Sequence, residues 1–277
     1  MAGYANPEAL VETDWLAERL GDPDVRIIEV DEDTSVYRTG HIPNAVAWDW
    51  FEDLHTDVGR DYVDQDGLAR LLSEAGVGPD TTVVLYGGSD NWFAAYAYWL
   101  LKYLGFEGAK LLNGGRKKWE AEDRELTSEV PSFQATDLRI DGPVRKDLRA
   151  FRDEVLHRLG SASFVDVRSP EEYRGEKLAP DHLPQEQSQV PGHIPGAANV
   201  PWAQAVNDDG TFKSAEELRE LYASKGATGD TDVIAYCRIG ERSSHTWFAL
   251  HELLGIENVK NYDGSWTEYG SLVGVPV

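Results

Sequence analysis

The amino-acid sequence predicts an α/β protein made of two copies of one domain, each with a mainly parallel sheet flanked by helices. Two observations predict this fold class. Apolar strand segments alternate with helical segments, and blocks of sequence recur in the same order in both halves of the 277 residues. That length suits two domains of ordinary size. Ligands of such sheets bind at the carboxyl ends of the strands, so residues there are the first candidates for function.

The first two repeated blocks are an apolar strand and a Gly-His-Ile-Pro turn. The strand at 28–31 (Ile-Glu-Val-Asp) matches 165–168 (Val-Asp-Val-Arg), and the turn at 40–45 matches the turn at 192–197. The spacing between the two blocks is longer in the second half, which places an insertion at about 175–190. That insertion is polar and contains prolines, so it predicts a surface loop.

The third repeated block is a strand, a helix, a glycine and a second strand. In the first half the strands are Thr82–Tyr86 and Ala109–Leu112. Aligning Tyr86 with Tyr236 extends the match without a gap through the following helix of the second half. The aromatic run at 92–99 predicts that this helix is buried, and its apolar stretch is too short to cross a bilayer.

Cys237 is the only cysteine, and it follows the apolar run 233–236 directly before a helix that we expect to begin near Ser243. A thiol becomes a nucleophile as the thiolate, and the positive end of the helix together with Arg238 and Arg242 predicts a lowered pKa for this thiol. A buried structural cysteine is the alternative, which two adjacent arginines disfavour. With no second cysteine, a resolving thiol would have to come from another molecule.

The first copy departs from the second at this loop. Opposite Cys237–Arg242 it has Gly87–Trp92, which lacks the thiol and both arginines. We therefore expect the N-terminal copy to be catalytically inactive. His41 and His193 belong to the turn that both copies share, so a structural task is predicted for them, and His245 is expected to pack or cap a helix.

These motifs resemble the two-domain rhodaneses, or thiosulfate sulfurtransferases. The resemblance covers nearly the whole chain. It rests on the repeated Gly-His-Ile-Pro turn, the Cys-Arg-x-Gly loop at Cys237, and the C-terminal segment Val259–Tyr269. It implies two tandem rhodanese-like domains, which we place at 1–127 (inactive) and 144–277 (catalytic), with a linker at 128–143 of mixed polar composition.

The resemblance also implies a mechanism. In that family the cysteine takes a sulfane sulfur from a donor, holds it as a persulfide and passes it to a thiophilic acceptor such as cyanide. Cys237 would be the nucleophile. The active-site loop would comprise Arg238, Ile239, Gly240, Glu241, Arg242 and Ser243, and the donor anion would be bound by Arg168, Arg238 and Arg242. The implied partners are a small anionic sulfur donor and an unspecified thiol or sulfur-carrier acceptor.

Three alternatives to a thiosulfate enzyme stay open. A 3-mercaptopyruvate sulfurtransferase is one, but Arg238 in the loop and Glu172, where those relatives carry a second arginine, favour thiosulfate. A cysteine-dependent phosphatase or arsenate reductase is disfavoured because such loops need an arginine six residues after the cysteine, and Arg242 comes one residue too early. A sulfur-binding module without turnover is the third.

Composition limits the partners and the setting. The net charge of −23 and the pI of about 4.6 argue against nucleic acid or an anionic membrane as a partner. Acidic residues spread along the whole chain suggest a halophilic source. No Cys or His cluster has metal-ligand spacing, so neither a metal nor a cofactor is predicted. The N-terminus lacks a signal-peptide pattern and the lone thiol suits a reducing compartment, so we expect a cytoplasmic protein.

Overall fold

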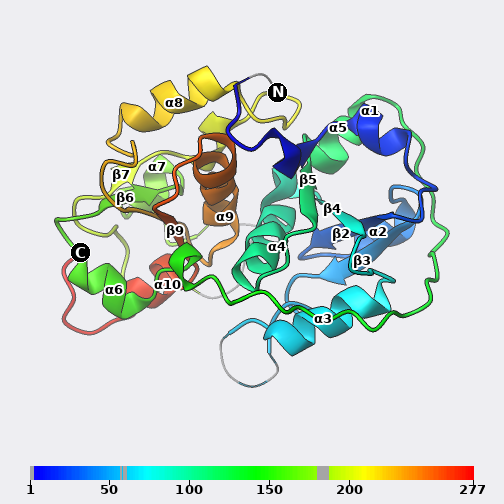
Figure 1. The fold of residues 1–277 in the computed structure, drawn as a ribbon. Coiled ribbons are helices and arrows are strands. Elements are labelled where there is room, and N and C mark those ends of the chain that lie inside the picture. The colour runs from blue at the N-terminus through cyan, green and yellow to red at the C-terminus, as the bar shows by residue number, and fades with distance from the viewer. Residues whose placement is uncertain (1–2, 57, 59–60, 180–186) are drawn as a thin grey trace. The chain divides into compact units, whose positions relative to one another are not determined.

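The computed structural model of the chain describes residues 3–56, 58, 61–179 and 187–277. Contacts divide it into two compact units. The first unit holds Glu8–Arg145 and Asp208–Thr211, and the second unit holds Met1–Pro7, Lys146–Asn207 and Phe212–Val277. Each unit is a parallel sheet with flanking helices (Figure 1), so the predicted fold class is confirmed.

The sheet of the first unit has five parallel strands in the order β1-β5-β4-β2-β3. The strands are β1 (Leu10–Val11), β2 (Val25–Asp31), β3 (Ala45–Asp49), β4 (Thr82–Tyr86) and β5 (Ala109–Leu112). The helices are α1 (Thr13–Ala17), α2 (Ser35–Thr39), α3 (Gln65–Glu74), α4 (Trp92–Tyr103) and α5 (Gly115–Ala121). Short 3-10 turns lie at Pro7–Ala9 and Ser89–Asn91.

The sheet of the second unit has four parallel strands in the order β7-β6-β8-β9. The strands are β6 (Ser163–Asp166), β7 (Ala198–Asn199), β8 (Val233–Tyr236) and β9 (Val259–Tyr262). The helices are α6 (Arg152–His157), α7 (Pro170–Tyr173), α8 (Ala215–Ala223), α9 (Glu241–Phe248) and α10 (Ser265–Tyr269). A π-helical turn at Ala249–Leu253 continues α9, and 3-10 turns lie at Lys146–Leu148 and Trp202–Ala205.

The helix predicted from the aromatic run is α4, and it is buried as expected. Its side chains from Phe93 to Leu101 and that of Tyr103 are buried, and it packs on β2, β4 and β5. The apolar sequence of α4 therefore reflects packing on all sides within a globular protein. Among the described residues no helix is long and apolar enough to span a membrane.

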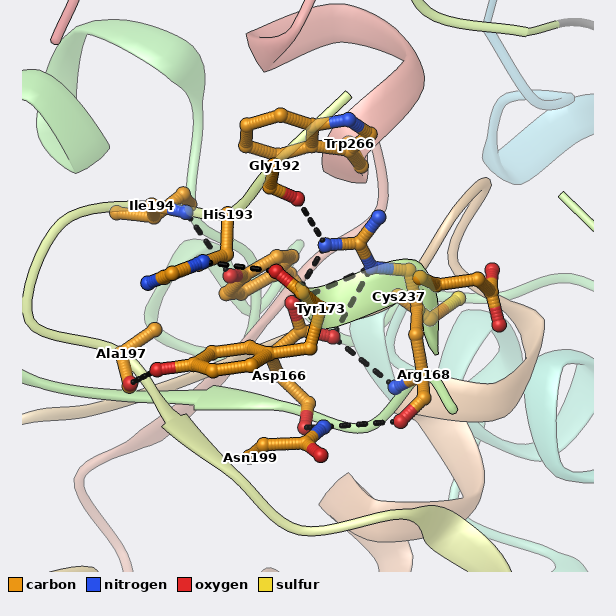
Figure 2. Close-up of polar contacts among 12 residues, drawn as sticks. Asp166, Arg168, Tyr173, Gly192, His193, Ile194, Ala197, Asn199, Cys237 and Trp266 are labelled. Atoms are coloured by element: carbon orange, nitrogen blue, oxygen red, sulfur yellow. Dashed lines mark hydrogen bonds and ion pairs between the residues drawn. The ribbon is translucent and has the colours of Figure 1, made fainter. Parts of the chain in front are cut away.

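The Gly-His-Ile-Pro turns adopt the same hydrogen-bonded arrangement in both units. The Nδ1 atom of His41 lies 2.8 Å from the carbonyl of Tyr37, and the two rings stack with centroids 3.8 Å apart. His193 makes the same contact with Tyr173, at the same two distances (Figure 2). Both histidines hold their turns in place, as the repeat predicts.

The hydroxyl of a strand tyrosine closes each turn from the other side. Tyr86 accepts a hydrogen bond from the N–H of Ile42 at 3.0 Å, and Tyr236 accepts one from Ile194 at 3.1 Å. The two turns are thus anchored to equivalent strands, β4 and β8.

Two predicted loop segments have no regular structure. The linker predicted at 128–143 is irregular throughout, and Thr136 donates its N–H to the carbonyl of Ser73 in the first unit. The exact limits of the domains and of the linker stay a prediction. The insertion predicted at 175–190 contains neither helix nor strand where it is described, and residues 180–186 of it lie outside the described residues.

Candidate active site

Cys237 lies at the carboxyl end of β8, the central strand pairing with both β6 and β9. A short turn follows, and α9 begins at Glu241, two residues earlier than the sequence suggested. Gly240 makes this turn possible, because its φ of 106° is left-handed and a Cβ there would lie 3.0 Å from two atoms of Asp263. The thiol is therefore placed on a tight strand-to-helix turn.

The C-terminal segment fixes the backbone of this turn. Ser265 Oγ accepts the N–H of Cys237 at 3.0 Å, Trp266 donates its N–H to the carbonyl of Cys237, and Thr267 donates to the carbonyl of Arg238, both at 3.1 Å. These contacts explain why a C-terminal motif accompanies a cysteine loop some thirty positions earlier in the chain. The motif positions the loop.

The thiol is buried, and both hydrogen-bond donors and one acceptor lie close to its sulfur. Cys237 is 0% exposed, and its Sγ accepts the N–H of Gly240 at 3.2 Å and lies 3.7 Å from the hydroxyl of Ser243. The thiol donates to Glu241 Oε2 at 3.3 Å. The N–H groups of Gly240 and Ser243 both interact with this sulfur, and two such donors form a cradle that suits a bound anion.

The expectation of a lowered pKa for this thiol is wrong. Burial raises the pKa of Cys237, and the carboxylate of Glu241 raises it further, while Arg242 and the N–H groups of Ser243 and Gly240 act in the opposite direction. The sequence showed the helix terminus and the arginines but gave no measure of burial, which disfavours any charged form.

Arg242 lies beside the thiol but is engaged by a carboxylate from α7. Its Nη1 and Nη2 donate to Glu172 Oε2 and Oε1 at 2.9 and 3.0 Å, and both side chains are buried. Although burial raises the pKa of Glu172, the hydrogen bond and charge of Arg242 hold that pKa below its ordinary value. Glu172 is further fixed by a capping box with Ser169, whose Oγ accepts its N–H at 3.3 Å.

Arg168 follows β6, the neighbour of β8, so it leaves the sheet at an end adjacent to that of Cys237 (Figure 2). It is 0% exposed and forms a two-point contact with Asp166, with Nη2 at 2.6 Å from Oδ2. Nη2 also donates to the carbonyl of Gly192 at 2.8 Å. Among the described residues its Nη1 has no hydrogen-bond partner.

The remaining predicted loop residues divide by exposure. Arg238 is buried at 1% exposure, whereas Ile239 is partly exposed. Ser243 is fully buried and donates to Asn261 Oδ1 at 2.7 Å. Of the predicted loop residues, Gly240, Glu241 and Ser243 contact the Cys237 thiol.

Sequence reasoning missed three residues that shape the site. Glu172 holds Arg242, Ser265 receives the N–H of Cys237, and Asn261 on β9 binds Ser243 and Ser244. A signal existed for two of them, because Asn261 and Ser265 belong to the C-terminal motif already singled out. The capping sequence Ser-Pro-Glu-Glu predicts a helix that begins at Pro170 and has Glu172 in its first turn, but it does not predict the partner of Glu172.

The equivalent loop of the first unit is closed by its own side chains. Asn91 Oδ1 accepts the N–H of Gly87 at 3.0 Å, and Asp31 Oδ2 accepts that of Gly88 at 2.8 Å. A Cβ at Gly87 would lie 2.3 Å from the carbonyl oxygen of Val30, so this backbone has no room for a cysteine. This geometry supports the prediction that the first copy is inactive.

Known proteins place the chain in a family. A family model described as a rhodanese-like domain matches residues 12–122 and 151–272. The chain belongs to the rhodanese family. Relatives of this chain in that family include several proteins named as putative thiosulfate sulfurtransferases. In the described residues no three His, Cys, Asp or Glu side chains are grouped so that they could hold a metal ion.

Three relatives match over almost their entire length. A "putative thiosulfate sulfurtransferase" of Mycolicibacterium smegmatis is 59% identical over 99% of this chain and 98% of its own. The "sulfur carrier protein TtuD" of Thermus thermophilus is 55% identical over the same shares. A "putative thiosulfate sulfurtransferase" of Haloferax volcanii is 53% identical over 98% of this chain and 96% of its own.

Solved structures give the same fold. The crystal structure of YnjE aligns with a TM-score of 0.84 at 26% identity, covering 99% of this chain and 69% of that one. The Escherichia coli SseA structure, titled as a 3-mercaptopyruvate sulfotransferase, aligns with a TM-score of 0.76 at 27% identity, covering 93% and 98%. Relatives of this chain thus differ in the sulfur donor or role that their names state.

Proposed function

We propose that this protein transfers a sulfane sulfur from thiosulfate to a thiophilic acceptor through a persulfide on Cys237. The observation that carries the proposal is the position of the thiol: the chain's single cysteine lies on a turn between β8 and α9, where the N–H groups of Gly240 and Ser243 interact with its sulfur. A terminal persulfide sulfur is an anion, and oriented donors of this kind stabilise one.

The transfer has two steps. The thiolate attacks the outer sulfur of thiosulfate, the S–S bond breaks, and sulfite leaves with the bonding pair, so that Cys237 carries a persulfide anion. A thiophilic acceptor such as cyanide then attacks the terminal sulfur, and the thiolate of Cys237 is the leaving group. No net oxidation of the enzyme occurs over this cycle, which is covalent catalysis of the ping-pong type.

Positive charge near the thiol supports an anionic donor. Arg168, Arg238 and Arg242 are buried in or beside the loop. The Nη1 of Arg168, which has no hydrogen-bond partner among the described residues, supports a donor contact there. Glu172 engages Arg242, and the family resemblance implies a second arginine at the position of Glu172 in enzymes that use 3-mercaptopyruvate. Both features favour thiosulfate, and 3-mercaptopyruvate is the second candidate because the similar SseA structure bears that activity in its title.

Mass spectrometry tests the proposal. Incubation with thiosulfate should add one sulfur atom to Cys237, and cyanide should remove it as thiocyanate. Cys237→Ser should fold and do neither, because a hydroxyl cannot hold a sulfane sulfur. Activity retained in that variant would refute the mechanism. A sulfur that is gained but that no acceptor removes would instead identify a storage module.

A comparison of donors tests the substrate. Turnover of thiosulfate and of 3-mercaptopyruvate should be measured with the same acceptor. A preference for 3-mercaptopyruvate of tenfold or more, about 1.4 kcal/mol in transition-state free energy, would overturn the thiosulfate assignment. Hydrolysis of a phosphate monoester or reduction of arsenate at comparable rates would overturn both donors.

We also propose that the domains divide at 1–127 and 144–277 and that the protein works in a cytoplasm of high salt. The net charge of −23 supports the high-salt setting, as does the similar protein of Haloferax volcanii. Concentrated KCl screens repulsion between surface carboxylates. Thermal unfolding should therefore shift to higher temperature in molar KCl, and an unchanged midpoint would contradict this setting.

A further inference from the structure

Glu241 is the first residue of α9, and its carboxylate is buried against the thiol. It is 1% exposed, and its Oε2 is the atom to which Cys237 donates at 3.3 Å. A buried carboxylate is unfavourable unless its charge is compensated by a partner or it takes up a proton. Its membership of the active-site loop is predicted from the sequence, which leaves its role open.

The charges around the thiol leave Glu241 weakly compensated. Among the described residues the charged groups that act on Cys237 are Glu241 and Arg242, and Glu172 binds Arg242. Both terminal nitrogens of Arg242 bond to Glu172, and its Nε lies 3.5 Å from Glu241 Oε1. Among the described residues Oε1 of Glu241 accepts no hydrogen bond. One guanidinium therefore serves two carboxylates.

Sulfur loading makes this arrangement more costly. An anionic donor approaches, and the product persulfide carries a negative charge next to the carboxylate. The thiol must also lose its proton, and its sulfur is 0% exposed. Among the described residues Glu241 Oε2 is the carboxylate oxygen within hydrogen-bond distance of that sulfur. A proton that moved to this oxygen would remove one negative charge at the moment when another forms.

We propose that Glu241 is a catalytic residue that takes the proton of the Cys237 thiol as the persulfide forms and returns it when the sulfur leaves. This inference rests on the proposed function. In the loading step, thiol, carboxylate and thiosulfate become persulfide anion, carboxylic acid and sulfite, with no change in total charge. In the second step the acceptor takes the sulfur, the thiolate is released, and Glu241 gives the proton back to it.

The destination of the proton can be counted in weakly buffered solution with a pH indicator. Loading of the wild-type protein with thiosulfate should release no proton to the solvent, after correction for uptake by the released sulfite, which added sulfite calibrates. Alkylation with iodoacetamide should release one proton per Cys237, because the neutral thioether leaves Glu241 a carboxylate as before. That second count shows that the thiol carried a proton at the start.

Glu241→Gln keeps the side-chain shape but cannot take the proton. At a pH where alkylation shows its thiol to be protonated, this variant should release one proton for each sulfur loaded. Glu252→Gln is the matched control, since Glu252 is a buried carboxylate in the π-helical turn that bonds to Asn6 and not to the thiol. It should behave as the wild type does.

Release of one proton per sulfur by the wild-type protein would overturn the role of Glu241, whether or not the variant folds. Retention of the proton in a folded Glu241→Gln protein would overturn it too. Mass spectrometry on each sample keeps this result separate from the proposed function: a wild-type protein that gains no sulfur from thiosulfate refutes the proposed function itself.

Discussion

Arg242 and Glu172 join α9 to α7 through two parallel hydrogen bonds of 2.9 and 3.0 Å in which both side chains are buried. Such a pair contributes little to stability as a whole, but removal of one partner leaves an uncompensated buried charge. The cysteine loop therefore depends on an acid seventy positions away in the sequence.

Arg242→Met should lower the free energy of unfolding by about 3 to 5 kcal/mol, because Glu172 would remain buried without its partner. Urea denaturation measures this loss. The double variant Arg242→Met with Glu172→Met removes both charges and should recover part of it. If the single and double variants lose the same free energy of unfolding, the unpaired charge of Glu172 is not the cause of the loss.

Arg242 should also influence the thiol. Because its charge lowers the pKa of Cys237 against the effect of burial, Arg242→Met should move alkylation of Cys237 by iodoacetamide to higher pH. Arg242→Lys keeps a cation and should shift the profile less. An unchanged profile in a folded Met variant would mean that the guanidinium charge does not reach the sulfur.

Asp31 should make the folded state sensitive to pH. Burial raises the pKa of Asp31 to about 7, and the N–H of Gly88 only partly opposes this. Because this folded-state pKa lies above that of the unfolded chain, stability is lost as the pH rises from about 4 to 7. Asp31→Asn removes the titration and keeps an acceptor for Gly88.

The free energy of unfolding of Asp31→Asn should therefore rise relative to that of the wild type across that range. The rise is at most about 4 kcal/mol, because each pH unit contributes about 1.4 kcal/mol. Urea denaturation at pH 5 and pH 8 measures the gain. An advantage that stays constant with pH, or that shrinks as the pH rises, would contradict the titration of Asp31.

His245 should make the folded state less stable as the pH falls, which is the opposite of the effect of Asp31. Burial lowers the pKa of His245 to about 3, and its ring stacks on Phe212 with centroids 4.5 Å apart. A histidine that is neutral in the fold stabilises above the unfolded-state pKa and loses this contribution as the pH falls from about 6.5 towards 3. His245→Phe should make stability less dependent on pH in this range, as measured by thermal unfolding. If the midpoint of thermal unfolding changes with pH as steeply in His245→Phe as in the wild type, His245 does not cause this pH dependence.

Introducing a cysteine into the loop of the first unit should not make that loop active. Since a Cβ at Gly87 would lie 2.3 Å from the carbonyl oxygen of Val30, Gly87→Ala should cost about 1 to 3 kcal/mol of stability. Gly87→Cys in a Cys237→Ser background should cost as much and gain no sulfur from thiosulfate. Persulfide formation at position 87 would show that the loop can open.

The fold was predictable because it rests on local pattern and repetition. The alternation of strands and helices, the duplicated turn and the position of Cys237 at the end of β8 all follow from residues close together in the chain. The electrostatics of the site were not predictable. Whether Arg242 faces a donor or Glu172 depends on a contact between segments that are distant in the sequence. In a chain with a net charge of −23, the sequence does not distinguish a buried acidic residue from the many acidic residues on the surface.

The Gly-His-Ile-Pro turn, with its histidine stacked on a tyrosine in both units, identifies a copy of the domain in a genome sequence but does not show whether that copy is active. This turn survived duplication in the copy that has no thiol, so finding it in a new sequence counts the copies of the domain and says nothing of their chemistry. The chemistry depends on the residue that directly follows the strand tyrosine to which the turn is bonded, Cys237 after β8 and Gly87 after β4. Sequence surveys that score only the turn will therefore count inert domains as enzymes.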